Sequence, residues 1–221
     1  MEPKVLMLII YSPSPLYDAQ RDFWRKYMPP NCYFIVNASV PEIILAGDTL
    51  LIPGTESYEG ILAKTLTAFD YFLSRDSYDF VVRTNVSSIW DYPKLLAKLS
   101  TRPHSGYYGG SIGGGFGHLM YASGSGMVLT PDVCKKLSTV AFNFQWVDDD
   151  VAIGIITKML NVEMINDGDR LDVLFDTADV PAGWYHYRVR LVPYYTQTRD
   201  PEMITKTINC MERVRYLMSS S

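Results

Sequence analysis

The chain has 221 residues, of which 48% are hydrophobic and 20% are charged. A chain of this length and composition can bury a full-sized core, and we treat residues 1–221 as one domain. The net charge of −4 comes from a mixed surface without long blocks of one sign. This argues against a nucleic-acid-binding protein, since such proteins usually carry a basic face.

The cysteines indicate the cellular compartment. Cys32, Cys134 and Cys210 are odd in number and widely spaced, and no Cys-x-x-Cys pair marks a zinc or redox centre. Such thiols are typical of a reducing compartment, so we expect a cytoplasmic protein. The apolar run from Val5 to Ile10 is too short for a signal peptide or a membrane span and predicts a buried strand. If the chain is a fragment of a longer protein, an anchor could lie outside it.

The first half of the chain predicts alternating strands and helices. The predicted elements are a strand over residues 4–11, a helix from Pro15, a strand over 33–37, a helix over 57–74, a strand over 79–84 and a helix over 92–99. Ser14 can cap the first helix, and Pro15 suits its first position. The helix over 57–74 is the clearest, because its apolar residues recur at a spacing of 3.6 residues.

The pattern changes after Leu99. Residues 106–117 are dense in glycine and lead into an interrupted apolar run over 119–129. The stretch from Gly109 to Gly117 could let the backbone approach a ligand or flex as a lid, or it could be a surface loop without a role. The remaining predicted elements are a helix from Pro131, a helix over 148–160, strands over 161–166 and 184–191, and a closing helix from Pro201.

Strands that alternate with helices predict an α/β fold, in which ligands bind at the carboxyl ends of the strands. Ser12 and Pro13 follow the first strand, and residues 85–88 follow the strand over 79–84. The common nucleotide-binding motifs are incomplete. The stretch Gly113–Gly117 does not complete G-x-G-x-x-G, and Ala63 stands where a Walker loop needs glycine. ATP hydrolysis and a dinucleotide-binding fold are therefore disfavoured.

Five segments follow one another in a characteristic order. They are AQRDFWRKY from Ala19, SYEGILAKTLTAFDYF from Ser57, YDFVVRTNVSS from Tyr78, YASGSGMVLTPDVCKKL from Tyr121 and DDVAIG from Asp149. Together they resemble the GT-A glycosyltransferases, and most of all the inverting fringe and β1,3-galactosyltransferase group. The form RTNVSS and the late segment WYHYRVR are also similar to glycosyltransferases carried by large DNA viruses of algae.

This resemblance implies a GT-A-like (Rossmann-like) fold with a mixed, mostly parallel central sheet flanked by helices. It also implies transfer of a sugar from a nucleoside-diphosphate sugar, with a UDP-sugar expected, to a hydroxyl of a glycan or glycoprotein. A viral protein of this kind would act in the host cytoplasm. We expect no nucleic-acid partner, and no membrane span within this chain.

The resemblance gives the three consecutive aspartates distinct roles. Asp150 matches the general base that takes the acceptor proton, Asp149 becomes a hydrogen-bonding or substrate-binding neighbour, and Asp148 becomes the helix cap. Without the resemblance, the three aspartates could form only a helix N-cap with companions that the helix dipole favours.

The segment expected to bind the diphosphate departs from the family. Where the family presents carboxylates to a divalent cation, this chain has Asn85, Val86 and Ser87. Asn85 and Ser87 are the predicted metal ligands, but their neutral oxygens would hold Mn²⁺ or Mg²⁺ less tightly than carboxylates do. Metal binding must then depend on the diphosphate of the donor, or the metal is dispensable. The alternative for this segment is a plain β-turn.

Further residues complete the predicted donor site. Ser12 and Pro13 lie where the nucleoside would rest in this fold, although a Ser-Pro turn has an equally good structural reason. Arg83 could bind phosphate or pair with a carboxylate. Because side chains alternate along a strand, it should point to the face of the sheet opposite to Val82. Lys64 resembles a family position, whereas a lysine on a helix is more often simply solvated.

His186 and Arg188 alternate on one predicted strand, so they point to the same face and could reach a diphosphate or supply a metal ligand. Three other functions stay open at this point. A retaining transferase could use the same fold, a non-catalytic module could bind a nucleotide sugar or carbohydrate, and a nucleotidyltransferase would release pyrophosphate.

Overall fold

The computed structural model describes residues 2–114, 117–140, 147–167, 170–173, 183–191 and 199–219. Two residues of the predicted glycine-rich stretch, Gly115 and Phe116, lie outside this range. The described residues form a sheet of eight strands and a second sheet of three strands. Among the helices in these segments, none is long and apolar enough to cross a membrane.

The main sheet is mixed and mostly parallel, as predicted. In spatial order its strands are β3 (Ile44–Ala46), β4 (Thr49–Pro53), β2 (Cys32–Ala38), β1 (Val5–Ile10), β5 (Phe80–Asn85), β8 (Ala122–Leu129), β7 (Tyr108–Ile112) and β9 (Met164–Asn166). β3 runs antiparallel to β4, and β8 runs antiparallel to both of its neighbours. The other neighbouring pairs are parallel. This confirms the α/β class and the predicted type of sheet.

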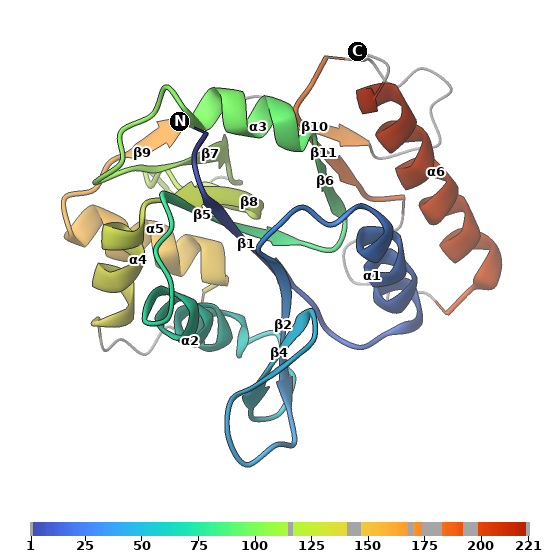
Figure 1. Ribbon diagram of the computed structural model, residues 1–221, viewed down its shortest axis with the longest axis horizontal. Coiled ribbons are helices and arrows are strands. Elements are labelled where there is room, and N and C mark those ends of the chain that lie inside the picture. The colour runs from blue at the N-terminus through green and yellow to red at the C-terminus, as the bar shows by residue number, and fades with distance from the viewer. Residues whose placement is uncertain are drawn as a thin grey trace.

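Helices cover both faces of the main sheet (Figure 1). They are α1 (Pro15–Tyr27), α2 (Ile61–Leu73), α3 (Tyr92–Leu99), α4 (Pro131–Ser138), α5 (Asp149–Met159) and α6 (Pro201–Ser219). α1 begins as the sequence predicts, because the Ser14 Oγ accepts a hydrogen bond of 3.3 Å from the Tyr17 backbone N–H and Pro15 occupies the first turn.

β1 shows why the sheet needs two layers of helices. All six of its residues are buried, and alternate side chains of a strand point to opposite faces. Met7 and Ile9 pack in the cluster that holds apolar side chains of α1, α3 and α6. Leu6 and Leu8 pack in the cluster that holds those of α2, α4 and α5. The unbroken apolar run is therefore a central strand.

Several predicted boundaries are wrong by a few residues. α2 begins at Ile61 rather than Ser57, where Gly60 donates its backbone N–H to the Ser57 Oγ over 3.1 Å. The first part of the glycine-rich stretch is strand β7, in which Gly109 and Gly110 are buried, so it is not a surface loop there. The strands predicted over 161–166 and 184–191 are shorter, at Met164–Asn166 and His186–Val189.

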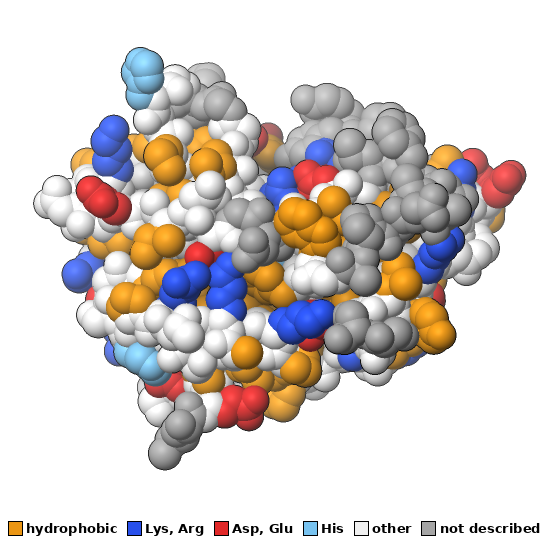
Figure 2. Space-filling view, turned by 90° about the horizontal axis from the view of Figure 1, so that it is seen from above, with side chains coloured by type: hydrophobic (Ala, Val, Ile, Leu, Met, Phe, Trp, Pro, Cys, Tyr) orange, Lys and Arg blue, Asp and Glu red, His pale blue; other side chains and the backbone are white. Residues whose placement is uncertain are grey.

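The charges are mixed on the face shown in Figure 2, where basic, acidic and hydrophobic side chains are interspersed. This face agrees with the expectation of a surface without a single-sign field. The three cysteines, Cys32, Cys134 and Cys210, are buried free thiols. Burial raises the pKa of the Cys32 and Cys134 thiols well above the ordinary value, so both stay protonated and packed as apolar groups.

The second sheet has one apolar and one polar face. Its strands are β10 (Arg170–Val173), β11 (His186–Val189) and β6 (Ser88–Trp90), in that order. Val173, Tyr187 and Val189 pack in the cluster that also holds side chains of α6. The residues between them have polar or aromatic side chains and, because strand side chains alternate, these occupy the opposite face. They are Arg170, Asp172, His186, Arg188, Ser88 and Trp90.

Gly126 of β8 lets this second face approach the main sheet. A Cβ atom at Gly126 would lie 2.4 Å from a ring carbon of Trp90 and 2.6 Å from a ring carbon of His186. The two rings are themselves stacked, with centroids 3.8 Å apart and planes 7° from parallel. Neither ring can turn away without breaking this stack, so the position requires glycine.

We expect Gly126→Ala to lower the free energy of unfolding by about 1–3 kcal/mol, the usual cost of overpacking a core. Urea unfolding followed by circular dichroism would measure it. Gly114→Ala is the matched control, because a Cβ there meets only the Tyr121 hydroxyl, at 3.7 Å. Equal losses in the two variants would contradict the packing argument.

Candidate active site

Most of the predicted site residues come from elements that reach one edge of the main sheet, whereas His186 and Arg188 lie on the second sheet. The carboxyl ends of the parallel strands β1 and β5 lie there, next to each other. β8 runs in the opposite direction, so its amino end, which includes Ser123 and Gly124, reaches the same edge. α5 packs against β8. The edge is where ligands bind in open α/β sheets.

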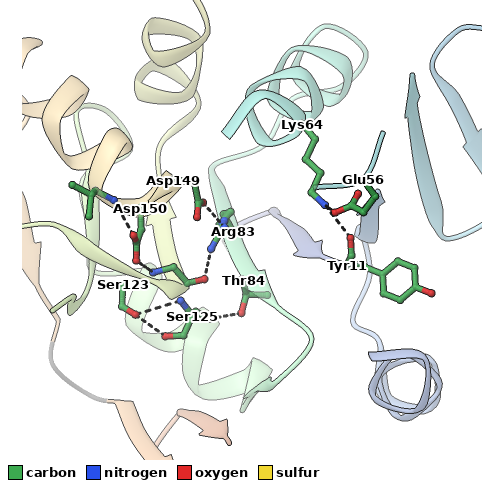
Figure 3. A network of polar contacts seen from close by, with 11 residues as sticks. Tyr11, Glu56, Lys64, Arg83, Thr84, Ser123, Ser125, Asp149 and Asp150 are labelled. Carbon is green, nitrogen blue, oxygen red and sulfur yellow. Dashed lines mark hydrogen bonds and ion pairs between the residues drawn. The ribbon is translucent and has the colours of Figure 1, made fainter. Parts of the chain in front are cut away.

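Arg83 of β5 is paired with Asp149 at the start of α5 (Figure 3). The guanidinium donates from Nη2 to the Asp149 Oδ2 and from Nη1 to the Gly124 carbonyl oxygen. The side chains of Arg83 and Asp149 are only 3% and 10% exposed. Burial raises the pKa of Asp149, while the charge of Arg83 opposes that rise. Of the two predicted roles of Arg83, the structure shows the pairing with a carboxylate.

Asp150 is held by two backbone N–H groups. Its Oδ2 accepts a hydrogen bond of 2.7 Å from Gly124, and its Oδ1 accepts one of 2.9 Å from Val151. The peptide groups at Gly124 thus bind Asp150 through N–H and Arg83 through C=O. A Cβ atom at Gly124 would lie 2.9 Å from the Arg83 Nη1 and 3.2 Å from the Asp150 Oδ2. A side chain at this position would crowd both charged groups.

Asp148 occupies the N-cap position of α5, as predicted, but its side chain makes no capping hydrogen bond. The expectation that its carboxylate caps the helix is therefore wrong. Asp148 is exposed, and the carboxylate that binds a backbone N–H in the first turn is that of Asp150.

The turn after β5 is held by hydrogen bonds on several sides. The Asn85 Oδ1 lies 2.8 Å from the Ser87 Oγ and 3.1 Å from the Ser88 Oγ. The Trp24 indole N–H of α1 donates to the Val86 carbonyl over 3.1 Å, and the backbone N–H of residue 189 donates to the Ser87 carbonyl over 2.8 Å. The turn is therefore fixed by α1 and by the second sheet.

The donor atoms of this turn do not fit a divalent cation. The lone pairs of the Asn85 Oδ1 face the hydroxyls of Ser87 and Ser88. Over the described ranges, no three His, Cys, Asp or Glu side chains are grouped to hold a metal ion. Mn²⁺ and Mg²⁺ prefer several charged or free oxygen ligands, so metal binding by Asn85 and Ser87 stays a prediction that the geometry disfavours.

Lys64 of α2 is completely buried, so it is not a solvated surface lysine. Its Nζ donates to the Tyr11 carbonyl over 3.0 Å and to the Glu56 Oε1 over 2.5 Å. The Glu56 Oε2 accepts the backbone N–H of Asn37 at the end of β2 over 2.8 Å. Burial lowers the pKa of Lys64, and Glu56 opposes this. Figure 3 shows Lys64 between Tyr11 and Glu56. Through Glu56 and its bond to Asn37, Lys64 thus connects the ends of β1 and β2.

Ser12 and Pro13 follow Tyr11 at the end of β1, where Ser12 is partly exposed and Pro13 is exposed. They are therefore accessible at the predicted edge. Their contact with a nucleoside stays a prediction.

His186 and Arg188 share the polar face of the second sheet, as their alternation predicts. His186 is 2% exposed and stacks on Trp90. Burial lowers the pKa of His186 well below its ordinary value, and the neighbouring Arg170 and Arg188 lower it further. The imidazole is therefore neutral at pH 7. Arg188 lies directly opposite Ser88 in the antiparallel pairing of β11 and β6, so it lies beside the turn after β5.

Sequence reasoning missed Arg170 and Glu56. The Arg170 Nη1 donates to the Ser125 Oγ over 2.6 Å, and its Nε lies 2.8 Å from the Asp172 Oδ1. The alternation of Arg170 and Asp172 along the chain is the signal that could have indicated a polar strand face there. Glu56 precedes α2, and no sequence pattern indicated its contact with Lys64.

Arg83, Asp149 and Asp150 thus form one network, and Lys64 and Glu56 form a second network at the same edge. Two surface hollows lie elsewhere. One follows α6 around Lys206 and Arg213, and the other lies between α1 and β6, beside Trp24 and Trp90.

No protein-family profile and no curated protein matches the chain. Solved structures do match it. One is a galactosyltransferase, LgtC, in complex with donor and acceptor sugar analogues, with 12% identity, a TM-score of 0.46 and coverage of 97% of this chain and 96% of that chain. Another is an active-site mutant of LgtC, with 10% identity, a TM-score of 0.46 and coverage of 93% and 96%. Because these similarities are low, we base the function on the residues of this chain.

Proposed function

We propose that the chain is a GT-A-like glycosyltransferase. It would move a sugar from a nucleoside-diphosphate sugar, most simply a UDP-sugar, to a hydroxyl group of a glycan or glycoprotein. The observation that carries this proposal is the convergence at Gly124. Arg83 and Asp150, 67 positions apart in the sequence, bind the carbonyl and the N–H of that residue. Motifs that resemble the donor-binding strand and the catalytic-base motif therefore share one site.

In this proposal Asp150 is the general base. The two backbone N–H groups that donate to Asp150 fix the plane of its carboxylate. Each carboxylate oxygen keeps a second lone pair that can accept a hydrogen bond from the hydroxyl of the acceptor sugar. A carboxylate oriented before the substrate arrives loses little freedom when the acceptor binds. The deprotonated hydroxyl attacks the anomeric carbon from the side opposite the diphosphate, which inverts the configuration.

Arg83 and Asp149 act as positioning residues. The Arg83 guanidinium already binds Asp149 and the Gly124 carbonyl, so it holds the strand and the start of α5 in register with each other. Lys64 and Glu56 do the same for the ends of β1 and β2. Ser12, Pro13 and Lys64 belong to the edge that would receive the nucleoside.

A second candidate is a module that binds a nucleotide sugar or carbohydrate without turnover. The neutral side chains of Asn85 and Ser87, which bind each other, favour it. A retaining transferase on the same fold is distinguished by the anomeric configuration of the product, which NMR reports. The fringe-like subgroup, a viral origin and a cytoplasmic location stay predictions.

Incubation with a panel of UDP- and GDP-sugars and simple acceptor glycans tests the proposal, with free nucleotide and pyrophosphate as the measured products. We expect nucleoside diphosphate to be released in step with a glycosylated acceptor. A binding module would give saturable binding in calorimetry without release. Release of pyrophosphate would instead indicate a nucleotidyltransferase.

A further inference from the structure

The part of β8 that binds the proposed base lies outside the strand pairing of the main sheet. The register between β8 and β5 ends at Gly126, and the register between β8 and β7 breaks off and resumes only at Ala122. In the registers of the described strands, residues 123–125 therefore have no paired residue on either side. Gly124, in the middle of this segment, nevertheless donates its N–H to Asp150. Contacts other than sheet pairing must fix its position.

Side chains hold the next residue, Ser125, in place of sheet pairing. The Ser125 carbonyl oxygen accepts hydrogen bonds from the Thr84 Oγ1 over 2.6 Å and from the Ser88 Oγ over 2.7 Å. The Ser125 Oγ accepts a hydrogen bond of 2.6 Å from the Arg170 Nη1. Figure 3 shows the contact between Thr84 and Ser125. Because Gly124 and Ser125 share a peptide group, the contacts of Ser125 also restrict Gly124.

Arg170 belongs to the second sheet, and all three nitrogens of its guanidinium are engaged. Its Nε and Nη2 lie 2.8 Å and 3.0 Å from the two carboxylate oxygens of Asp172, so a bidentate pair fixes one edge of the planar group. The third nitrogen, Nη1, is the one that binds Ser125. The side chain of Arg170 is only 13% exposed. Asp172 thus orients a shielded, charged donor toward the segment that holds the base.

This contact matters more for catalysis than for stability. Asp172 is 35% exposed, so water screens its pair with Arg170 and the net gain in stability is small. A general base, by contrast, must lie within hydrogen-bond reach of the proton that it takes. A displacement of about 1 Å at such a group can cost about 10²-fold in rate.

We propose that Arg170 is a positioning residue for the general base, which it holds through Ser125 and Gly124. This inference rests on the proposed transfer function. Arg83 binds the Gly124 carbonyl, and Arg170 fixes the adjoining Ser125 from the second sheet. Together they keep the Gly124 N–H on the Asp150 Oδ2, over 2.7 Å. The carboxylate is then oriented before the acceptor binds, and the second sheet is part of the support of the site.

Steady-state kinetics of Arg170→Gln test the inference, with the UDP- or GDP-sugar and the acceptor glycan that give the highest turnover. We expect kcat to fall about tenfold or more, because the base is displaced. The KM of the acceptor and the calorimetric affinity for UDP or GDP should change by less than about twofold, since the contact supports the transition state and not substrate binding. Arg170→Lys keeps a charged donor for Ser125 and should restore part of kcat.

Arg25→Gln is the matched control. Arg25 forms the same kind of bidentate pair with Asp48, with Nε to Oδ2 and Nη2 to Oδ1 distances of 2.7 Å and 3.0 Å. Asp48 precedes β4, at the amino ends of the parallel strands and away from the candidate site. The variant should therefore leave kcat unchanged.

Ser125→Ala tests the route from Arg170 to the base. It removes the hydroxyl that Arg170 binds and leaves the carbonyl contacts of Ser125, and it serves if Arg170→Gln does not fold. If Arg170 acts through Ser125, the double variant should lose no more kcat than Arg170→Gln alone. Amide hydrogen exchange at Gly124, followed by NMR, reports the same coupling without turnover, and it should be faster in Arg170→Gln than in Arg25→Gln.

Several results would overturn this inference and leave the transfer function intact. They are an unchanged kcat in Arg170→Gln, an equal loss of kcat in Arg25→Gln, losses that multiply in the double variant, and exchange at Gly124 that is no faster in Arg170→Gln than in the control. Absence of sugar transfer by the unchanged protein would overturn both the inference and the proposed function.

Discussion

Replacing Asp150 with asparagine is expected to abolish sugar transfer while the protein still folds and binds the donor. An amide has no lone pair basic enough to take the acceptor proton, and the loss of a general base costs about 10²–10⁴-fold in rate. The fold should tolerate the change, because the amide oxygen can still accept the Gly124 N–H that now binds Asp150 over 2.7 Å, and only the bond from the Val151 N–H in the first turn of α5 is lost. Initial rates of nucleotide release and calorimetry with the donor would measure the two effects.

Asp148→Asn is the matched control for this variant. It makes the same chemical change two residues earlier, at an exposed side chain that forms no capping hydrogen bond. We expect its rate and melting temperature to stay close to those of the unchanged protein. Full activity in Asp150→Asn would remove the assignment of the base, and an equal loss in both variants would point to the charge of the helix start instead.

The elements with strong local signals were predictable from the sequence. The helix over 92–99 has the bounds predicted for it, because Asp91 caps it through the Lys94 N–H and Pro93 suits its first turn. β1 was recognisable because a short, unbroken apolar run rich in branched side chains is typical of a strand that is buried on both faces. The ranges predicted for the short strands β9 and β11 were too long, since strand ends depend on pairing partners that lie elsewhere in the chain.

The candidate site was predictable only in part. The order of motifs brought Arg83, Asp149 and Asp150 together, and the structure shows them in one network. Local sequence does not give the burial of Lys64, because a lysine on a helix is usually solvated and its partner Glu56 lies 8 positions earlier, outside the helix. The second sheet was beyond prediction, since it joins strands at residues 88–90, 170–173 and 186–189 through pairing alone.

Replacing Arg83 with methionine is expected to destabilise the protein by about 3–5 kcal/mol at neutral pH, the usual cost of leaving one partner of a buried ion pair without its counter-charge. The variant keeps the bulk of the side chain but leaves the Asp149 carboxylate, which is 10% exposed, beside no guanidinium. The Gly124 carbonyl loses the same donor. Urea unfolding would measure the loss, and Arg75→Met is the control, because Arg75 is exposed and follows the C-cap of α2.

The pH dependence identifies the source of that loss. Burial already raises the pKa of Asp149 in the folded protein, and removal of Arg83 raises it further. A folded state that binds the proton more tightly than the unfolded chain becomes less stable as pH rises through the interval between their two pKa values. The deficit of Arg83→Met should therefore be largest at neutral pH and shrink toward about pH 4, near the unperturbed pKa of aspartate. The double variant Arg83→Met/Asp149→Asn has no unpaired carboxylate at this position, so it should recover most of the lost stability. A deficit that is equal at all pH values and persists in the double variant would show that lost packing, and not the unpaired charge, is its cause.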